Sequence, residues 1–187
     1  MRKSWILYFV ISGICLFGCM SPKERTEEVI KEFKKEKVVL PYEDMSCWIN
    51  DSIQHNRPWE QAKLKLVIYV DSTNCSECTL KTMYMWKDFV EMEQEYKPDF
   101  FLVYIFQTKK EIAPRALASE FKITELNHPM YIDSQSVFAK SNPHLPQESL
   151  YHIFLLDNEN NVILVGNPLF NPQIEELLRK EVEDRIK

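Results

Sequence analysis

Hydrophobic residues fall into two dense runs near the middle of the chain, with a long amphipathic stretch between them. The runs at 64–70 and 100–106 are apolar at nearly every position, which is typical of central parallel strands buried on both faces. Residues 77–96 contain no Pro or Gly and repeat apolar side chains at helical spacing, and Pro98 follows them. The pattern therefore predicts a strand, a long helix and a second strand.

The rest of the chain continues this alternation with shorter elements. We expect one or two short strands within 38–53, a helix at 111–121, a strand at 129–133, a helical or turn segment at 134–140, a hairpin of strands 151–156 and 162–165, and a last helix at 172–187. Asn171 suits the cap of that helix and Pro172 its first position. Strand–helix–strand order implies parallel pairing, so the predicted class is α/β with an antiparallel hairpin at one edge.

Two cysteines, Cys75 and Cys78, stand where the first of these strands gives way to the long helix. Thiols at this spacing can close a small disulfide ring, and the start of a helix lowers the pKa of a thiol. The pattern favours a thiol–disulfide redox site. Two alternatives stay open, an inert structural pair and half of a zinc site, although zinc would need a second ligand pair that the sequence does not display.

The start of the chain has the features of a lipoprotein signal. Arg2 and Lys3 precede an apolar stretch at 5–17 that is short for a membrane span. The run Leu16–Cys19 resembles the bacterial lipobox, which implies cleavage before Cys19 and a lipid on that residue; a plain anchor or plain secretion is the alternative. We divide the chain into a signal at 1–18, a charged helical spacer at 19–37 and a domain at 38–187 with its core at 64–187.

Composition and charge narrow the functional class. The chain is 45% hydrophobic and holds three Gly, two of them in the leader, which excludes a glycine-rich phosphate loop. Its net charge is −5, and loss of Arg2 and Lys3 with the signal leaves 21 basic against 28 acidic residues, a charge of −7. This balance disfavours a nucleic-acid partner. We expect no metal ion and no cofactor.

With this element order and the Cys75/Cys78 pair after the first central strand, residues 64–187 resemble the thioredoxin-like superfamily. The chain is most similar to extracytoplasmic lipoproteins of the TlpA/ResA type, in the style of Bacteroidetes-type bacteria, because 154–163 matches the closing hairpin of that family. The resemblance implies a three-layer sandwich, a central mixed sheet flanked by helices. It also implies that Cys75 attacks a substrate disulfide and that Cys78 resolves the mixed disulfide.

Around the dithiol the chain departs from the family pattern. The family has a cis-proline before the closing hairpin, where this chain has Tyr151, and the nearest proline is Pro146. The family's usual Trp before the first Cys is replaced by Asn74. The acidic residue of the preceding strand would fall near Tyr69, and Asp71 can replace it only if its side chain points inward.

Two residues near the motif, Glu77 and His152, are expected to influence how readily Cys75 forms a thiolate. Glu77 lies inside the motif and opposes thiolate formation at Cys75, which argues for the upper end of the family's pKa range, roughly 3.5 to 7, and for a reductant. His152 would face the dithiol if the hairpin aligns as expected; the alternative is an ordinary strand histidine with satisfied ring nitrogens.

The resemblance implies a membrane-anchored thiol–disulfide oxidoreductase whose partners are exported thiol or disulfide proteins and a membrane reductant. The alternative is a non-catalytic envelope lipoprotein that uses the fold as a binding module, which Tyr151 favours. Ser72, three residues before Cys75, resembles the Ser/Thr-x-x-Cys of peroxiredoxins, but Ile68 stands where those enzymes have a Pro, which disfavours a peroxidase. A copper chaperone would need three residues between its thiols, and this chain has two. Cys47 is the one cysteine of the domain outside the motif. We expect it to be buried; the alternatives are that it pairs with a partner protein or forms a relay with Cys75.

Overall fold

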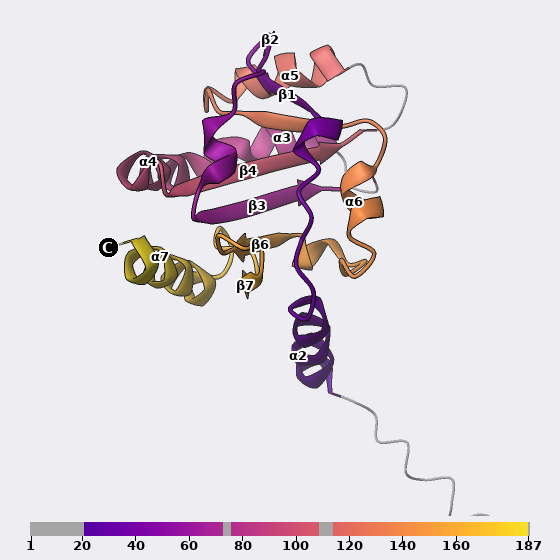
Figure 1. Ribbon diagram of the computed structural model, residues 1–187, viewed down its shortest axis with the longest axis vertical. Coiled ribbons are helices and arrows are strands. Elements are labelled where there is room, and N and C mark those ends of the chain that lie inside the picture. Colours follow the sequence, from indigo (N-terminus) through magenta and orange to yellow (C-terminus); the bar gives the residue numbers. More distant parts are fainter. Residues whose placement is uncertain (1–20, 73–75, 109–113, 187) are drawn as a thin grey trace, which may run out of the picture.

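The computed structural model describes residues 21–72, 76–108 and 114–186, and for 76–78 it describes the backbone alone. Within these ranges a sheet of seven strands has the order β2-β1-β5-β4-β3-β6-β7 (Figure 1). Its strands are β1 (Ser46–Ile49), β2 (Ser52–Ile53), β3 (Leu64–Val70), β4 (Phe100–Gln107), β5 (Met130–Asp133), β6 (Ile153–Leu156) and β7 (Val162–Val165). β4 pairs in parallel with β3 and β5, and the other pairs are antiparallel.

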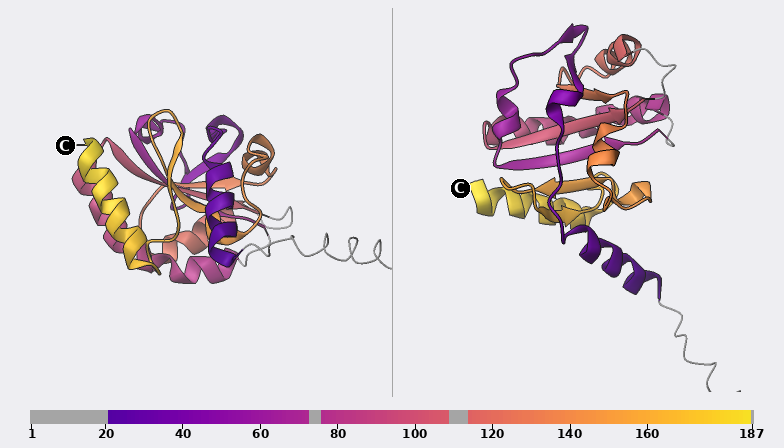
Figure 2. Two further views of the ribbon diagram at one scale, coloured as in Figure 1. Left: turned by 90° about the horizontal axis from the view of Figure 1, so that it is seen from below. Right: turned by 45° about the vertical axis from the view of Figure 1, so that its right-hand side comes forward.

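Helices and loops cover both faces of the sheet, which gives three layers (Figure 2). One face carries α3 (Ser76–Thr82), α4 (Lys87–Tyr96), α5 (Pro114–Ile123) and α7 (Pro172–Ile186). The other face carries α2 (Pro22–Phe33), α6 (Val137–Ser141) and the short 3-10 turns η1 (Tyr42–Asp44), η2 (Pro58–Gln61) and η4 (Ser149–Tyr151). This arrangement confirms the predicted α/β sandwich with a mixed central sheet.

Strand β3, an inner strand of the sheet, shows why the two dense apolar runs lack a polar face. All its residues are buried, and they alternate between the two cores: Leu66 and Ile68 belong to one, Val67 and Tyr69 to the other. Because β3, β4 and β5 run in the same direction, their carboxyl ends meet at one edge of the sheet. We call this edge the carboxyl edge; the segment with Cys75 and Cys78 follows β3 there.

The long helix predicted at 77–96 is interrupted. A 3-10 turn, η3 (Met83–Trp86), separates α3 from α4. Met83 and Trp86 are both buried in the same core, and a spacing of three residues places both inward when the helix tightens to three residues per turn. Burial of these two large side chains therefore overrides the regular period that the sequence suggested.

The segment predicted as a spacer contains α2, which begins with a Ser21–Glu24 capping box and Pro22 at its first turn. Phe33 near its end is fully buried, and Lys34 Nζ donates to the carbonyl oxygen of Ile163 at 2.7 Å, so α2 packs against the β6–β7 hairpin. Among the described helices, none is both long and apolar enough to cross a membrane.

Candidate functional site

The dithiol itself is only partly within the described residues. Cys75 lies outside them, as does Cys19, while Cys78 and Glu77 have a described backbone in the first turn of α3 and no described side chain. The residues on either side of the motif form a frame around it. β3 ends at Val70, Asp71 and Ser72 follow it, and α3 begins at Ser76.

A carboxylate and an imidazole meet directly behind this frame. Asp71 follows β3 and His152 precedes β6, and their side chains are 12% and 5% exposed. His152 Nδ1 lies 3.2 Å from Asp71 Oδ2. The side chain of Asp71 therefore points inward, which is the condition under which it can replace the strand acid of the family.

The other ring nitrogen of His152 determines where the proton is. Nε2 lies 2.8 Å from the carbonyl oxygen of Pro146, and since a carbonyl only accepts, Nε2 carries a hydrogen. Nδ1 is buried and makes no hydrogen bond of good geometry, although it faces the Asp71 carboxyl. Nδ1 is therefore the ring nitrogen that faces the Asp71 carboxyl.

A second group of polar side chains lies along the carboxyl edge. The Tyr69 hydroxyl donates to Gln107 Oε1, and Gln107 Nε2 donates to Ser72 Oγ at 3.2 Å and to Ser136 Oγ at 2.8 Å. Burial, and then the nearby carboxylate of Asp133, raise the pKa of Tyr69, so its hydroxyl remains a donor. Tyr69 also packs on His152 with 5.0 Å between ring centroids, which joins the two groups.

Tyr151 occupies the position expected for the family's proline. Its side chain is buried, and its hydroxyl lies 3.5 Å from Thr26 Oγ1 in α2. The carbonyl of the next residue, His152, accepts the Tyr69 N–H at 3.0 Å and so begins the pairing of β6 with β3. Among the described peptide bonds the cis bond precedes Pro98, and Pro146 is trans.

A hollow of about 220 Å³ borders the frame on the helical side of the sheet. Its walls come from α3, β3, β6 and the loop after β7, and they include Thr79, Thr82, Ile153 and Phe170. Phe170 is 70% exposed, which is unusual for a large aromatic side chain without a partner. Sequence analysis missed this loop; its signal was an isolated Phe170 between prolines that end the strand and begin the helix.

A larger hollow of about 670 Å³ lies on the opposite flank of α3, against α5. Tyr84 and Ile123 are exposed there, and Lys81, Glu120 and Glu125 border it. It does not touch β3, β6 or the Asp71–His152 pair. Of these two hollows, the smaller one therefore borders the end of β3 that leads into the motif.

Cys47 lies on β1, and two strands, β5 and β4, separate β1 from β3, the strand that leads into the dithiol segment. It is a free thiol, 1% exposed, and burial raises its pKa to about 12. The prediction of a buried cysteine is confirmed. Among the described side chains, no three His, Cys, Asp or Glu residues cluster as metal ligands would.

Comparison with solved structures identifies the fold. A domain of a possible thiol-disulfide isomerase from Cytophaga hutchinsonii is similar with a TM-score of 0.50 and 15% identity, over 81% of this chain and 95% of that one. The Xanthomonas campestris bacterioferritin comigratory protein has 0.51 and 10%, over 81% and 100%. An uncharacterized conserved protein from Geobacillus kaustophilus has 0.51 and 14%, over 76% and 79%.

These similarities, together with the sheet order, show that the chain has a thioredoxin-like fold, as the sequence predicted. No family model and no curated protein matches the sequence.

Proposed function

We propose that this protein is a lipid-anchored thiol–disulfide oxidoreductase of the cell envelope, of the TlpA/ResA type. The Cys75 thiolate attacks a substrate disulfide, a mixed disulfide forms and one substrate thiolate leaves. The Cys78 thiolate then attacks the Cys75 sulfur and releases the second substrate thiolate. The dithiol loses two electrons, the substrate gains them, and a membrane-bound thiol reductant restores the pair.

One observation carries the proposal. The two cysteines follow a strand that is buried at every residue, and polar side chains converge on the two residues after that strand: His152 on Asp71 and Gln107 on Ser72. Buried polar groups that serve only packing are costly, and their concentration beside a potentially reactive motif is typical of a functional site.

The Asp71–His152 pair supplies what exchange chemistry needs beside the thiols. Cys78 must lose a proton before it attacks the mixed disulfide, and a buried acceptor near it speeds that loss. Since His152 Nε2 is engaged by Pro146, Nδ1 and the Asp71 carboxyl are the atoms that exchange the proton. Glu77 adds negative charge within the motif and so favours the reducing direction.

The hollow beside α3 suggests the substrate class. Its apolar walls and the exposed Phe170 suit an extended polypeptide with an apolar side chain next to its cysteine. Exported proteins with exposed disulfides fit this description. A lipid on Cys19 and the spacer after it would hold the domain at the membrane surface outside the cytoplasm.

A non-catalytic binding module is the second candidate. Tyr151 favours it, because a buried tyrosine packed toward α2 stands where the family has a proline that contacts substrate. In that case the hollow would bind a partner without exchange.

Reduction of insulin by the purified protein, with glutathione as the electron donor, separates the two candidates. We expect turnover that is lost in Cys75→Ser and retained in Cys47→Ala, since both substitutions remove one thiol but only Cys75 belongs to the motif. Turnover that survives in Cys75→Ser would leave the binding module as the better account.

A further inference from the structure

Gln107 stands at the end of β4, where it joins three separate parts of the carboxyl edge. Its amide oxygen accepts the Tyr69 hydroxyl of β3, and its amide nitrogen donates to Ser72, which leads into the dithiol segment. The same nitrogen donates to Ser136 at 2.8 Å. One side chain thus connects the strand before the dithiol, the turn itself and the start of α6.

The far end of this connection is rigid. Gln107 pairs in register with Asp133, whose carboxylate accepts the backbone N–H groups of Val137 and Phe138 at 2.9 Å each. These bonds hold the first turn of α6, and with it Ser136, which precedes the helix with a φ of 56°. Ser72 is therefore held, through Gln107, against an element that is itself anchored in the sheet.

The amide is well suited to this place. A carboxamide offers acceptor and donor groups at once, and here both ends are used by side-chain hydroxyls. A glutamate would place a negative charge against Ser72, which lies three residues before Cys75, and an apolar residue of similar shape would leave three hydroxyl groups without their partner. Glutamine alone satisfies all of them without charge.

We infer that Gln107 is a positioning residue for the dithiol: it fixes Ser72, which leads into the motif, and so limits the conformations open to the chain on the amino side of Cys75. The inference rests on the proposed function and deepens it. Closing the Cys75–Cys78 disulfide costs conformational freedom, and a turn that is already fixed has less to lose. The network therefore stabilises the disulfide relative to the free dithiol.

Equilibration of the full chain with glutathione redox buffers measures this directly, by counting free thiols after acid quench and alkylation. We expect Gln107→Leu to lower the equilibrium constant for forming the Cys75–Cys78 disulfide about tenfold, the effect of one net hydrogen bond. Ser136→Ala should lower it about threefold, since one of the three bonds is lost. Gln135→Ala is the matched control, an exposed neighbour whose side chain lies outside the network, and it should leave the constant unchanged.

Gln107→Glu distinguishes positioning from mere support of the fold. The serine hydroxyls can turn and donate to the carboxylate, so the disulfide constant should return to within about threefold of wild type while thiolate formation at Cys75 shifts to higher pH. The rate of alkylation of Cys75, measured as a function of pH, reports that shift. If Gln107→Leu does not fold by near-ultraviolet circular dichroism, Ser72→Ala and Ser136→Ala carry the test.

Equal disulfide constants in wild type, Gln107→Leu and Ser136→Ala would overturn the inference and leave the proposed function standing. A wild-type protein whose Cys75 and Cys78 form no exchangeable disulfide would overturn both. The wild-type titration therefore decides which of the two has failed.

Discussion

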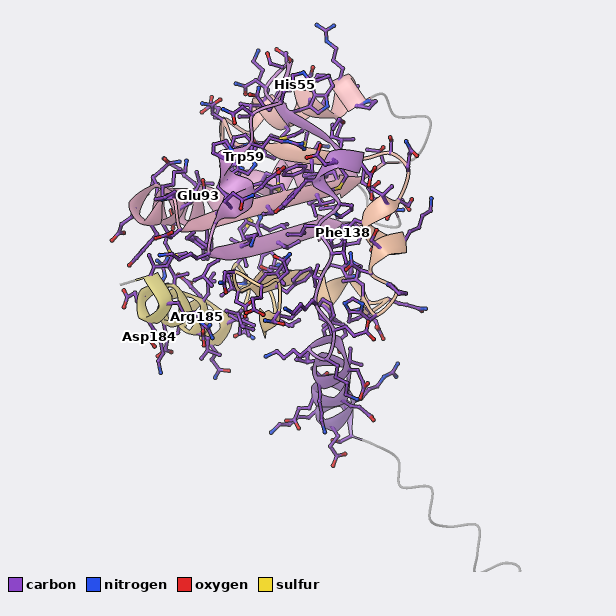
Figure 3. The ribbon with its side chains drawn as sticks, viewed as in Figure 1. His55, Trp59, Glu93, Phe138, Asp184 and Arg185 are labelled. Atoms are coloured by element: carbon purple, nitrogen blue, oxygen red, sulfur yellow. The ribbon has the colours of Figure 1, made fainter. Side chains whose placement is uncertain are left out.

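The two ends of the central strands each hold a buried histidine against a carboxylate, but only one pair lies beside the dithiol segment. At the amino end His128 Nε2 lies 2.7 Å from Glu93 Oε2, with the side chains 2% and 0% exposed. At the carboxyl edge His152 lies 3.2 Å from Asp71. In each histidine the second ring nitrogen binds a proline carbonyl, of Pro129 and Pro146. Figure 3 shows Glu93 near one end of the strands and Phe138, which packs on Tyr69, near the other.

The partners of the two carboxylates differ. Glu93 accepts the backbone N–H of Leu102 at 2.9 Å, where β4 extends beyond the start of β5, and it is 3.2 Å from Lys97 Nζ. Its Oε2 takes the place of a strand neighbour for the Leu102 N–H and also contacts His128, while its buried Oε1 has the Lys97 ammonium nearby and makes no hydrogen bond. Asp71 and His152 meet less closely, next to residues that lead into the motif. The comparison teaches that two similar histidine–carboxylate contacts can differ in their setting: the one at the amino end also binds the backbone of a strand, and the one at the carboxyl edge lies beside residues that lead into the motif.

The largest expected effect is on stability at the amino end. Glu93→Ala should lower the free energy of unfolding by about 3–5 kcal/mol, because it leaves His128 and the Leu102 N–H buried without their partner. Urea denaturation checks the value, with the exposed Glu95→Ala of the same helix as control. Turnover per folded molecule should not change. A loss of turnover in molecules that remain folded would contradict the claim that the pair at the amino end is purely structural.

The next effect is on activity at the carboxyl edge. His152→Gln should slow disulfide exchange at neutral pH at least about tenfold, since the proton acceptor is lost, and should shift the pH profile of the rate. Asp71→Asn should give a similar loss, and the double variant should be no slower than either, because the two act as a unit. Stopped-flow kinetics measures all three. Additive losses would mean that the residues act separately.

Cys47 sharpens the comparison, since it is a thiol that the fold keeps neutral. Its pKa is raised to about 12 from an ordinary 9.0, mainly by burial. Above pH 9 the unfolded chain releases this proton before the folded one, so stability falls as the pH rises through the interval from 9 to 12. Between pH 9 and 10 wild type should lose about 1 kcal/mol more than Cys47→Ala. Parallel curves for the two proteins would show that the buried thiol does not titrate as described.

The smallest effect concerns the substrate hollow. Phe170→Ser should raise the KM for insulin about threefold and leave the rate with glutathione disulfide unchanged, because only a polypeptide reaches the exposed ring. Ile123→Ser, in the larger hollow beside α5, is the matched control and should change neither. If Ile123→Ser raises the KM and Phe170→Ser does not, the larger hollow binds the substrate.

Much of the fold follows from local patterns, because strands buried on both faces, such as β3, are visible as unbroken apolar runs. The break at Met83–Trp86 is not visible locally, since it depends on which side chains the sheet receives. The motif cysteines were found from spacing alone. Gln107 was not, because an amide at a strand end carries no signal until register brings it opposite Asp133 and near Tyr69.

The prediction for Asp71 and His152 lies between these cases. Each was singled out, but their contact depends on the antiparallel pairing of β3 with β6, which brings His152 beside Tyr69. The sequence predicted that Asp71 would matter only if its carboxyl pointed inward. Whether it does so depends on the folded structure, which places the carboxyl against His152.

The most direct test is a glutathione titration of the wild-type protein followed by mass spectrometry of the alkylated chain. The account predicts one reversible two-electron transition in which Cys75 and Cys78 lose their alkyl labels together, with Cys47 unmodified until the chain is unfolded. A pair that stays reduced at every glutathione ratio, or a single cysteine that forms only a glutathione adduct, would contradict it.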